Sequence, residues 1–327
     1  MRKLASIQMI SDLQPIENAD NIMLARVLGW KVVVKKGEFQ VGDRCVYVEI
    51  DSILPDKPEF EFLRNKNFRI KTMKLRGQVS QGICFPISIL PTNQLEVGSD
   101  VTNLLGIKKY EPEIPISLGG DIKCKFPSFI PKTDEERIQT LDFSKLVNQY
   151  YTLTEKLDGT SSTFYVNNTY GVCGRNWEYK LDNQNAYIQI SKKYDIENKL
   201  RKLNQNIALQ GEIIGGKIQG NKYKRSELEV YFFKAFDIDN YSYLLPEDFF
   251  KLMKDLQLPT VPVIDKNFYI QKHYTNSFDD ISRLVTISKG VSMLNTQVKR
   301  EGLVYMNNES GESFKVINPD FSLKYGE

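Results

Sequence analysis

A lysine stands at the end of a strand-like run and is followed at once by a short turn that carries a carboxylate. The run 151–155 is rich in aromatic and threonine residues, Lys156-Leu157-Asp158-Gly159 follows it, and a second strand is expected over 162–166. A lysine amine attacks an electrophile only after losing its proton, which burial, a metal ion or other cations promote. The pattern indicates a nucleophilic lysine beside a phosphate, although a surface hairpin with a solvated lysine has the same signature.

Two glutamates lie beside glycines at expected strand ends and are candidates to act with Asp158. They are Glu212, in Gly211-Glu212-Ile213-Ile214-Gly215, and Glu301, in Glu301-Gly302-Leu303-Val304. Glycine lets a ligand or a metal-bound water approach the backbone, and Mg²⁺ prefers oxygen ligands and keeps several waters. We expect Asp158, Glu212 and Glu301 to hold Mg²⁺ (or Mn²⁺) through water. For either glutamate taken singly, a structural salt bridge is an equal alternative.

Several cations and one aromatic strand complete the set of chemistry-bearing residues. Arginine contacts phosphate in a bidentate manner and lysine acts as a point charge, so the candidates for phosphate contacts are Arg137, Arg175, Lys315 and Lys324. The strand expected over 231–238 carries Phe236, whose ring could stack on a nucleobase. Phe232 and Phe233 are expected to pack in the core.

Composition excludes several classes of protein. The 327 residues are 41% hydrophobic and 26% charged with a net charge of +3, which is typical of one large or two ordinary globular domains. No apolar run approaches the ~20 residues of a membrane span, and no signal peptide is visible. The four cysteines form no C-x-x-C pair, which disfavours structural zinc and favours a cytoplasmic or nuclear protein. His273 is the single histidine, so chemistry that needs two histidines is excluded.

The pattern of short strands and turns divides the chain into two expected domains. Residues 1–106 alternate apolar and polar residues over 45–50 and carry further strand-like runs at 27–34, 68–76 and 81–86, which predicts a small β-barrel. Residues 107–125 are rich in proline and glycine and are predicted to be a linker. Residues 126–327 mix strands with helices, which indicates an α+β domain. The helices are expected over 186–204, 246–256 and 277–289.

A basic stretch in the N-terminal domain is a candidate nucleic-acid contact. Residues 64–76 hold six basic side chains, an aromatic and no acid. Such a segment suits a phosphate backbone, although a solvated basic face is the alternative. The candidates are Arg64, Lys66, Arg69, Lys71, Lys74 and Arg76.

Six short motifs, in order, resemble the collinear motifs of the covalent nucleotidyltransferases, a superfamily of ATP-dependent DNA and RNA ligases and mRNA capping enzymes. Each motif alone is weak, whereas six in order over about 190 residues are specific. They are Lys156-Leu157-Asp158-Gly159, Arg175-Asn176, 211–215, Ala235-Phe236-Asp237-Ile238, 301–304 and Phe314-Lys315-Val316.

Within that superfamily the chain is most similar to RNA ligases. Cys173-Gly174-Arg175-Asn176 and the segment 215–221 resemble the RNA ligase 2-like group, and residues 3–8, 15–20 and 30–37 resemble the OB-like module of the Deinococcus/Naegleria-type RNA ligases. The resemblance implies an N-terminal OB-like β-barrel followed by a ligase/capping-enzyme-type nucleotidyltransferase domain with antiparallel sheets and flanking helices. One position departs from the pattern: many relatives have Lys-x-Lys in the last motif, whereas Ile317 takes the second position here.

The resemblance also implies a three-step reaction and a role for each motif residue. Lys156 would take AMP from ATP, the AMP would pass to an RNA 5′-phosphate, and an RNA 3′-OH would displace it, sealing a nick in a duplex as a monomer acting in RNA repair. Lys315 would contact the α-phosphate, Arg137 the outer phosphates, and Arg175 the AMP or the RNA 5′-phosphate. Phe236 would stack on adenine, Glu155 would lie at the adenine edge, and Lys324 would supply a further cation.

Four alternatives remain open from the sequence. The same lysine chemistry with GTP would make a capping guanylyltransferase, and a DNA 3′-OH as acceptor would make a DNA ligase. The N-terminal module could belong to a non-catalytic RNA-binding protein. An unrelated α+β protein with chance matches is the fourth.

Overall fold

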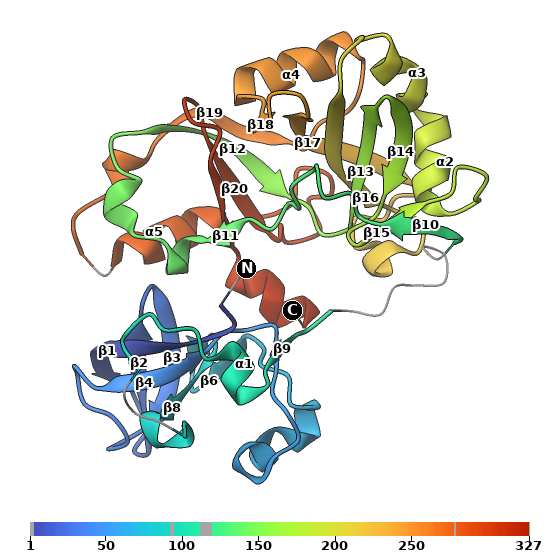
Figure 1. Ribbon diagram of the computed structural model, residues 1–327. Coiled ribbons are helices and arrows are strands. Elements are labelled where there is room, and N and C mark those ends of the chain that lie inside the picture. Colours follow the sequence, from blue (N-terminus) through green and yellow to red (C-terminus); the bar gives the residue numbers. More distant parts are fainter. Residues whose placement is uncertain (1–2, 92–94, 112–119, 278, 327) are drawn as a thin grey trace. The chain divides into compact units, whose positions relative to one another are not determined.

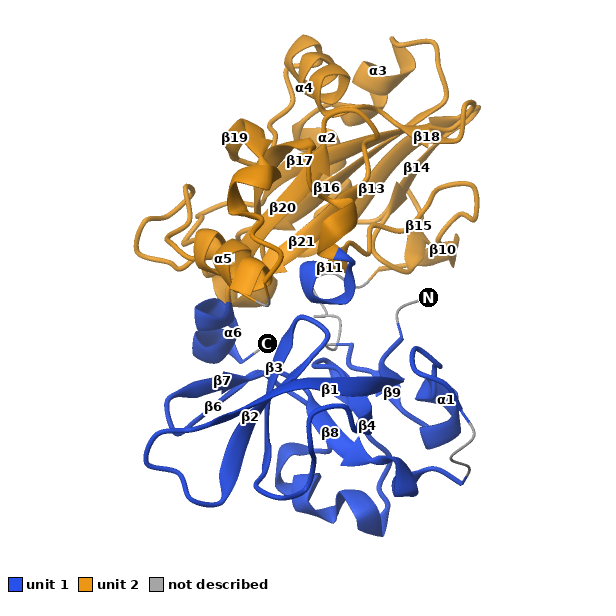
Figure 2. Cartoon of the chain, turned by 90° about the vertical axis from the view of Figure 1, so that its left-hand side faces the viewer, with its two compact units in different colours: residues 1–112, 138–142, 319–327 blue, residues 113–137, 143–318 orange. Residues whose placement is uncertain are grey.

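The computed structural model describes residues 3–91, 95–111, 120–277 and 279–326 (Figure 1). The chain divides into two compact units, coloured separately in Figure 2. Unit 1 comprises residues 1–112, 138–142 and 319–327, and unit 2 comprises residues 113–137 and 143–318. Among the described residues no helix is long and apolar enough to cross a membrane.

Unit 1 is built on a five-stranded antiparallel sheet that curls around its own core. The strand order is β3-β2-β1-β4-β8, and the backbone N–H of Gln81 donates to Lys31 O at 2.8 Å, which brings the segment before β8 to β3. Trp30 and Tyr47 fill the core and are at most 1% exposed. This confirms the predicted β-rich N-terminal domain. The strands are β1 (Ala5–Pro15), β2 (Ile22–Val27), β3 (Trp30–Lys35), β4 (Arg44–Val48) and β8 (Ile83–Pro86).

Two of the predicted N-terminal strands differ from the structure. The run 27–34 is a hairpin rather than one strand, because Leu28 adopts a positive φ of 53° and turns the chain between β2 and β3. In the run 68–76 only β6 (Met73–Leu75) is a strand, and it pairs with β7 (Gln78–Ser80). The remaining elements of unit 1 are the 3₁₀ helix Pro58–Lys66, β5 (Ser52–Ile53), α1 (Thr102–Leu105), β9 (Lys108–Lys109) and α6 (Pro319–Tyr325).

Unit 2 contains two sheets that carry the motif residues. The seven-stranded sheet has the order β10-β15-β14-β13-β16-β17-β18, and the five-stranded sheet has the order β11-β21-β20-β12-β19. The pairing is antiparallel except that β11 runs parallel to β21. The strands are β10 (Ile122–Lys125), β11 (Glu136–Arg137), β12 (Tyr150–Lys156), β13 (Thr160–Asn167), β14 (Thr169–Cys173), β15 (Trp177–Tyr179), β16 (Ile207–Ile214), β17 (Glu229–Asp237), β18 (Ser242–Tyr243), β19 (Val263–Tyr269), β20 (Gly302–Asn307) and β21 (Ser313–Ile317).

Helices cover one face of the seven-stranded sheet. α2 (Ala186–Lys193), α3 (Ile196–Arg201) and α4 (Pro246–Asp255) pack on that sheet around Phe164 and Phe232. The predicted helix 186–204 is two helices, because Asp195 adopts a positive φ of 51° between them. The predicted helix 246–256 is confirmed as α4, with Pro246 in its first turn, and 277–289 is confirmed as α5 (Asp279–Ser288).

The interval 107–125, predicted to be a linker, contains two short strands at its ends. β9 pairs with β5 and β10 pairs with β15. Its centre, residues 112–119, lies outside the described residues. The domain limits 1–106 and 126–327 stay predictions.

Candidate active site

Lys156 is the last residue of β12, as its pattern predicts, and β13 begins four residues later. The turn between them is pressed against β16. A Cβ on Gly159 would lie 2.3 Å from Ile213 O, so the close approach requires glycine. The Gly159 N–H donates to Glu212 Oε1 at 3.0 Å. The turn therefore brings the lysine strand and the Glu212 strand together.

Lys156 forms an ion pair with Glu301. Its Nζ lies 2.6 Å from Glu301 Oε1, and the Glu301 side chain is 9% exposed. Strand pairing sets this geometry, because Lys156 is opposite Gly302 across the antiparallel β12–β20 pair. A Cβ on Gly302 would lie 2.4 Å from Val316 O, which again requires glycine. The candidate nucleophile is thus held by a carboxylate 145 residues away in sequence.

The pKa of the Glu212 carboxyl is raised above its ordinary value. Burial of its carboxyl raises its pKa to about 7, Lys156 opposes the rise, and the like charge of Glu301 adds to it. Excess carboxylate charge of this kind suits a hard divalent cation. In the described part of the chain no three His, Cys, Asp or Glu side chains gather closely enough to hold a metal ion directly. An ion here would be held partly through water.

The raised pKa of Glu212 predicts a pH-dependent stability. The Glu212 carboxyl binds its proton more tightly in the folded protein, where its pKa is about 7, than in the unfolded chain, where it is near 4.5. The folded protein therefore loses stability as pH rises between these two values. Without metal, we expect wild type to lose roughly 2–3 kcal/mol of stability relative to Glu212→Gln between pH 5 and pH 8. Urea unfolding of both proteins in chelator measures this difference. Parallel curves for the two proteins would contradict the raised pKa.

Asp158 pairs with a lysine that the sequence analysis did not single out. Lys222 Nζ contacts Asp158 Oδ2, and the Asp158 backbone N–H donates to the Tyr223 hydroxyl at 2.8 Å. Both partners directly follow the segment 215–221, which was noted only for its resemblance to RNA ligases. The position of Lys222 directly after that segment is the sequence feature that could have indicated a role for it.

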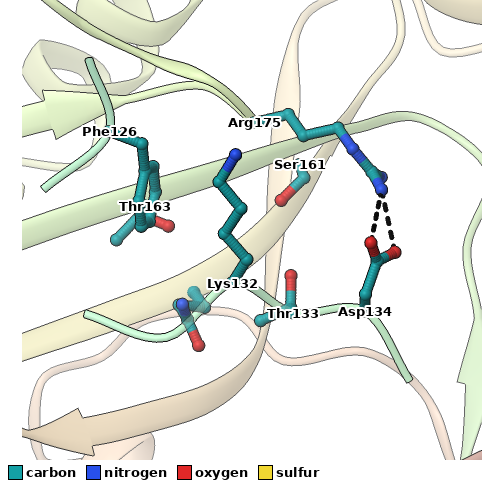
Figure 3. Close-up of a pocket in the computed structure, with 8 residues that line it drawn as sticks. Phe126, Lys132, Thr133, Asp134, Ser161, Thr163 and Arg175 are labelled. Carbon is teal, nitrogen blue, oxygen red and sulfur yellow. Dashed lines mark hydrogen bonds and ion pairs between the residues drawn. The ribbon is translucent and has the colours of Figure 1, made fainter. Parts of the chain in front are cut away.

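Arg175 lines a polar pocket together with residues from four other segments (Figure 3). Its guanidinium donates to both carboxylate oxygens of Asp134, at 2.8 and 2.9 Å. Figure 3 shows Arg175 and Asp134 pointing toward one another at one side of the pocket. The lining residues are Phe126, Lys132, Thr133, Asp134, Ser161, Thr163, Arg175 and Gln210. A phosphate at Arg175 would have to compete with Asp134.

Lys315 and Arg137 are neighbours, since they are opposite each other across the parallel β11–β21 pair. A third cation, which the sequence analysis missed, belongs to the same region: Lys234 Nζ lies 2.7 Å from Glu135 Oε1 and 2.5 Å from Ser313 Oγ. Ile317, at the position where relatives have lysine, is 6% exposed and packs in the core. Lys324 lies in α6 of unit 1, and its expected ATP contact stays a prediction.

The predicted adenine-contacting residues are more buried than expected. Glu155 is 1% exposed and accepts a hydrogen bond from Met293 N at 2.8 Å, and burial raises its pKa. Phe236 is also 1% exposed, and the rings of Tyr241 and Tyr243 meet it edge to face at 5.2 and 5.0 Å. The Phe236 ring therefore offers no open face to a base in this structure.

Phe233, which the sequence analysis assigned to the core, is the more accessible aromatic. It is half-buried and packs against a cluster that contains Leu157, the residue after the candidate nucleophile. Packing against this cluster agrees with the expected core position, and the partial exposure of Phe233 accompanies an irregularity in the strand. The β16–β17 pairing shifts register between Gln210 and Gly211.

The basic stretch 64–76 is partly neutralised by acids from outside it. Arg64 contacts Asp56 and Glu61 at 2.5 and 2.7 Å. Arg69 lies 3.4 Å from Asp51 and 3.4 Å above the centre of the Tyr110 ring, and burial lowers the pKa of Lys71. Arg64 is exposed in spite of its ion pairs, and Lys66, Lys74 and Arg76 are exposed as well.

Comparison with known proteins identifies the family. A family model described as an OB-fold domain matches residues 4–87, and a model described as RNA ligase matches residues 149–325. The chain belongs to the RNA ligase family. It is an enzyme by that membership, and the predicted order of an OB-like domain followed by a ligase domain is confirmed.

Solved RNA ligases resemble this family member over its whole length. Naegleria gruberi RNA ligase with PPi is 39% identical, with 98% of each chain covered and a TM-score of 0.91. A mutant with ATP and Mn is 38% identical, with 100% of each chain covered and a TM-score of 0.92. A mutant with AMP and Mn is 39% identical, with 98% of each chain covered and a TM-score of 0.90. No curated protein matches the sequence.

Proposed function

We propose that the protein is an ATP-dependent RNA ligase that acts through a covalent Lys156–AMP intermediate and an adenylylated RNA 5′-phosphate. The observation that carries the proposal is the Lys156–Glu301 contact of 2.6 Å at the meeting of β12 and β20. The Naegleria gruberi RNA ligase structures that contain ATP or AMP with Mn support it.

In the first step Lys156 Nζ bonds to the α-phosphorus of ATP, the α–β anhydride bond breaks, and pyrophosphate leaves. Nζ gives up a proton, and Glu301 Oε1 is an acceptor 2.6 Å away. An oxygen of the RNA 5′-phosphate then attacks the AMP phosphorus, the P–N bond breaks, and Lys156 regains its proton. Finally an RNA 3′-OH attacks the 5′-phosphate and AMP leaves. Positioning and charge neutralisation dominate such transfers.

Asp158, Glu212 and Glu301 would hold Mg²⁺ or Mn²⁺ through water. The bound ion would neutralise phosphate charge and favour the unprotonated lysine. The chain's own part is to bring Glu301, the residue before β20, into contact with Lys156, and to bring Glu212 of β16 against the turn that carries Asp158. The Naegleria gruberi RNA ligase has been solved as variants of lysine, aspartate and glutamate, the same residue types.

The cations divide between the two ends of the nucleotide. Lys315 and Arg137 would contact the phosphates, as the motif resemblance implies, and Arg175 would contact AMP or the RNA 5′-phosphate. Asp134 now holds Arg175 through both carboxylate oxygens. Since the pair is exposed, with side chains 45% and 52% accessible, a phosphate could replace the carboxylate at low cost.

We infer that Phe233 rather than Phe236 contacts adenine. Phe233→Ala should raise the ATP concentration for half-maximal labelling about 10-fold, since a base–aromatic stack contributes ~1–3 kcal/mol. Phe236→Ala should instead destabilise the fold by roughly 3–5 kcal/mol, because its ring is fully packed. ATP titrations and urea unfolding of both variants separate the two effects. A raised ATP requirement in Phe236→Ala alone, with unchanged stability, would restore the original assignment.

The N-terminal unit would grip RNA through its exposed basic side chains. Replacing Lys66, Lys74 and Arg76 with glutamine should reduce the slope of log binding constant against log salt by up to about 3, since each phosphate contact on a duplex contributes about 0.9. The control is the matched triple replacement of Lys192, Lys202 and Lys217, which are exposed lysines of unit 2. Fluorescence anisotropy with nicked duplex RNA at several salt concentrations measures the slopes. Equal slopes for the two triple variants would argue against this surface.

The function is tested by incubating the purified protein with Mg²⁺ and each α-labelled nucleoside triphosphate, followed by denaturing electrophoresis. We expect an acid-labile protein label from ATP alone, and sealing of a nicked duplex whose 3′-OH strand is RNA. A label from GTP would indicate a capping enzyme instead, and sealing only with a DNA 3′-OH would indicate a DNA ligase. We expect the protein to sediment as a monomer. We also expect it to act in RNA repair.

A further inference from the structure

One short segment, residues 219–223, contacts the Lys156–Gly159 turn in three places. The Lys222 ammonium pairs with the Asp158 carboxylate, the Tyr223 hydroxyl accepts the Asp158 backbone N–H at 2.8 Å, and Gln219 Nε2 donates to Gly159 O at 3.3 Å. The segment lies just beyond β16, which carries Glu212. The turn after the nucleophile is therefore held by both its side chain and its backbone.

The Lys222–Asp158 pair is the strongest of these contacts because water reaches it poorly. The side chains are 15% and 9% exposed, and Tyr223 beside them is 3% exposed. Removing one partner of such a pair leaves an uncompensated charge away from solvent, whereas an exposed pair contributes little. The orientation of the Asp158 carboxylate is therefore tied to Lys222.

The segment and the two residues after it, Lys224 and Arg225, are anchored to the loop 292–297. Asn295 Nδ2 donates to Tyr223 O at 3.3 Å, Arg225 donates to Leu294 O at 3.2 Å, and Lys224 Nζ contacts Gln297 Oε1 at 2.9 Å. The same loop holds Glu155, the residue before Lys156, through Met293 N. The loop 292–297 thus holds the residue before Lys156 directly, and it holds the turn after Lys156 through the segment 219–223.

We propose that Lys222 is a positioning residue for adenylylation: by holding Asp158, it fixes the turn so that Lys156 meets Glu301 and the α-phosphate. This inference rests on the proposed function. Lys222 acts through Asp158, and no direct contact of Lys222 with the nucleotide is required. A second carboxylate released near Lys156 would compete with Glu301 for its ammonium, since opposite charges attract without directional preference.

The test compares Lys222→Met, Lys222→Arg and Lys217→Ala. Lys217 is an exposed lysine of the same loop and serves as the matched control. In single-turnover labelling with α-labelled ATP, we expect Lys222→Met to lower the rate at saturating ATP about 30-fold and to change half-saturation less than about 3-fold. Lys222→Arg should stay within about 3-fold of wild type. A Lys222→Met rate within about 3-fold of wild type, or an arginine variant as slow as the methionine variant, would overturn the proposal.

A second measurement needs no ATP. Thermal unfolding of wild type, Lys222→Met, Asp158→Asn and the double variant tests the contact itself. We expect Lys222→Met to lower the midpoint by roughly 5–10 °C alone and much less in the Asp158→Asn background. Equal lowering in both backgrounds would overturn the pairing. If Lys222→Met does not fold, folding of the double variant supports the pairing and its failure to fold overturns it. If none of the α-labelled nucleotides labels the wild-type protein, the proposed function is wrong. The unfolding test of the Lys222–Asp158 contact is then still valid.

Discussion

We expect Lys156→Ala to abolish covalent labelling by α-labelled ATP, reducing it by at least ~10³-fold to background. No neighbouring side chain substitutes for the amine, because the geometry that pairs Lys156 Nζ with Glu301 at 2.6 Å is set by the β12–β20 register. Denaturing electrophoresis after incubation with Mg²⁺ and ATP measures the label, and intact mass measures the AMP adduct.

The same variant separates the first step from the last. Sealing of an RNA whose 5′-phosphate already carries AMP needs no new bond to Lys156, so Lys156→Ala should retain a measurable part of that activity. Lys217→Ala, which removes an exposed lysine, should label like wild type. Label that persists on Lys156→Ala at wild-type level would refute the assignment of the nucleophile.

We expect Glu301→Gln to lower the single-turnover adenylylation rate by roughly 10²–10³-fold. The substitution keeps the shape of a side chain that is 9% exposed, so it removes the charge and not the packing. The variant loses a proton acceptor 2.6 Å from Lys156 Nζ and one of the three carboxylates proposed to hold the divalent ion.

The control for this change is Glu309→Gln. Glu309 is an exposed glutamate just beyond β20, the strand that directly follows Glu301. Its rate should match wild type. Rapid quench measurements at saturating ATP and several Mg²⁺ concentrations compare the three proteins. If Glu301→Gln reacts within about 3-fold of wild type at every Mg²⁺ concentration, Glu301 has no role in the first step.

The contacts of the cations were beyond the reach of the sequence. Arg175 pairs with Asp134, 41 residues away, Lys234 with Glu135, 99 residues away, and Asp158 with Lys222, 64 residues away. Periodicity places a residue on a face of a strand, but loop paths and strand register decide which opposite charge reaches it. The same reason explains why the acid-free stretch 64–76 is partly neutralised by Asp51, Asp56 and Glu61.

Local chemistry, by contrast, was sufficient for the elements around the nucleophile. The strand ending at Lys156, the glycine turn after it and the amphipathic helix α4 follow from short-range rules of side-chain period, chain reversal and capping. The order of six motifs was sufficient for the superfamily, and the N-terminal segments together with residues 173–176 and 215–221 indicated RNA ligases within it. At Leu28 and Asp195 a positive φ ends a strand or a helix. The hydrophobic pattern of the sequence continues across both positions, so it does not reveal the break.

The sequence by itself therefore determined which residues could do the chemistry: a lysine on a strand end, three carboxylates beside turns and a set of cations. Only the tertiary structure decided which of them meet. Strand pairing brings Glu301 to Lys156, the turn against β16 brings Glu212, and the segment beyond β16 brings Lys222 to Asp158. It also buries Phe236 and leaves Phe233 accessible. The physical reason is that residue types and local period are properties of the chain, whereas burial and charge pairing depend on contacts between distant segments.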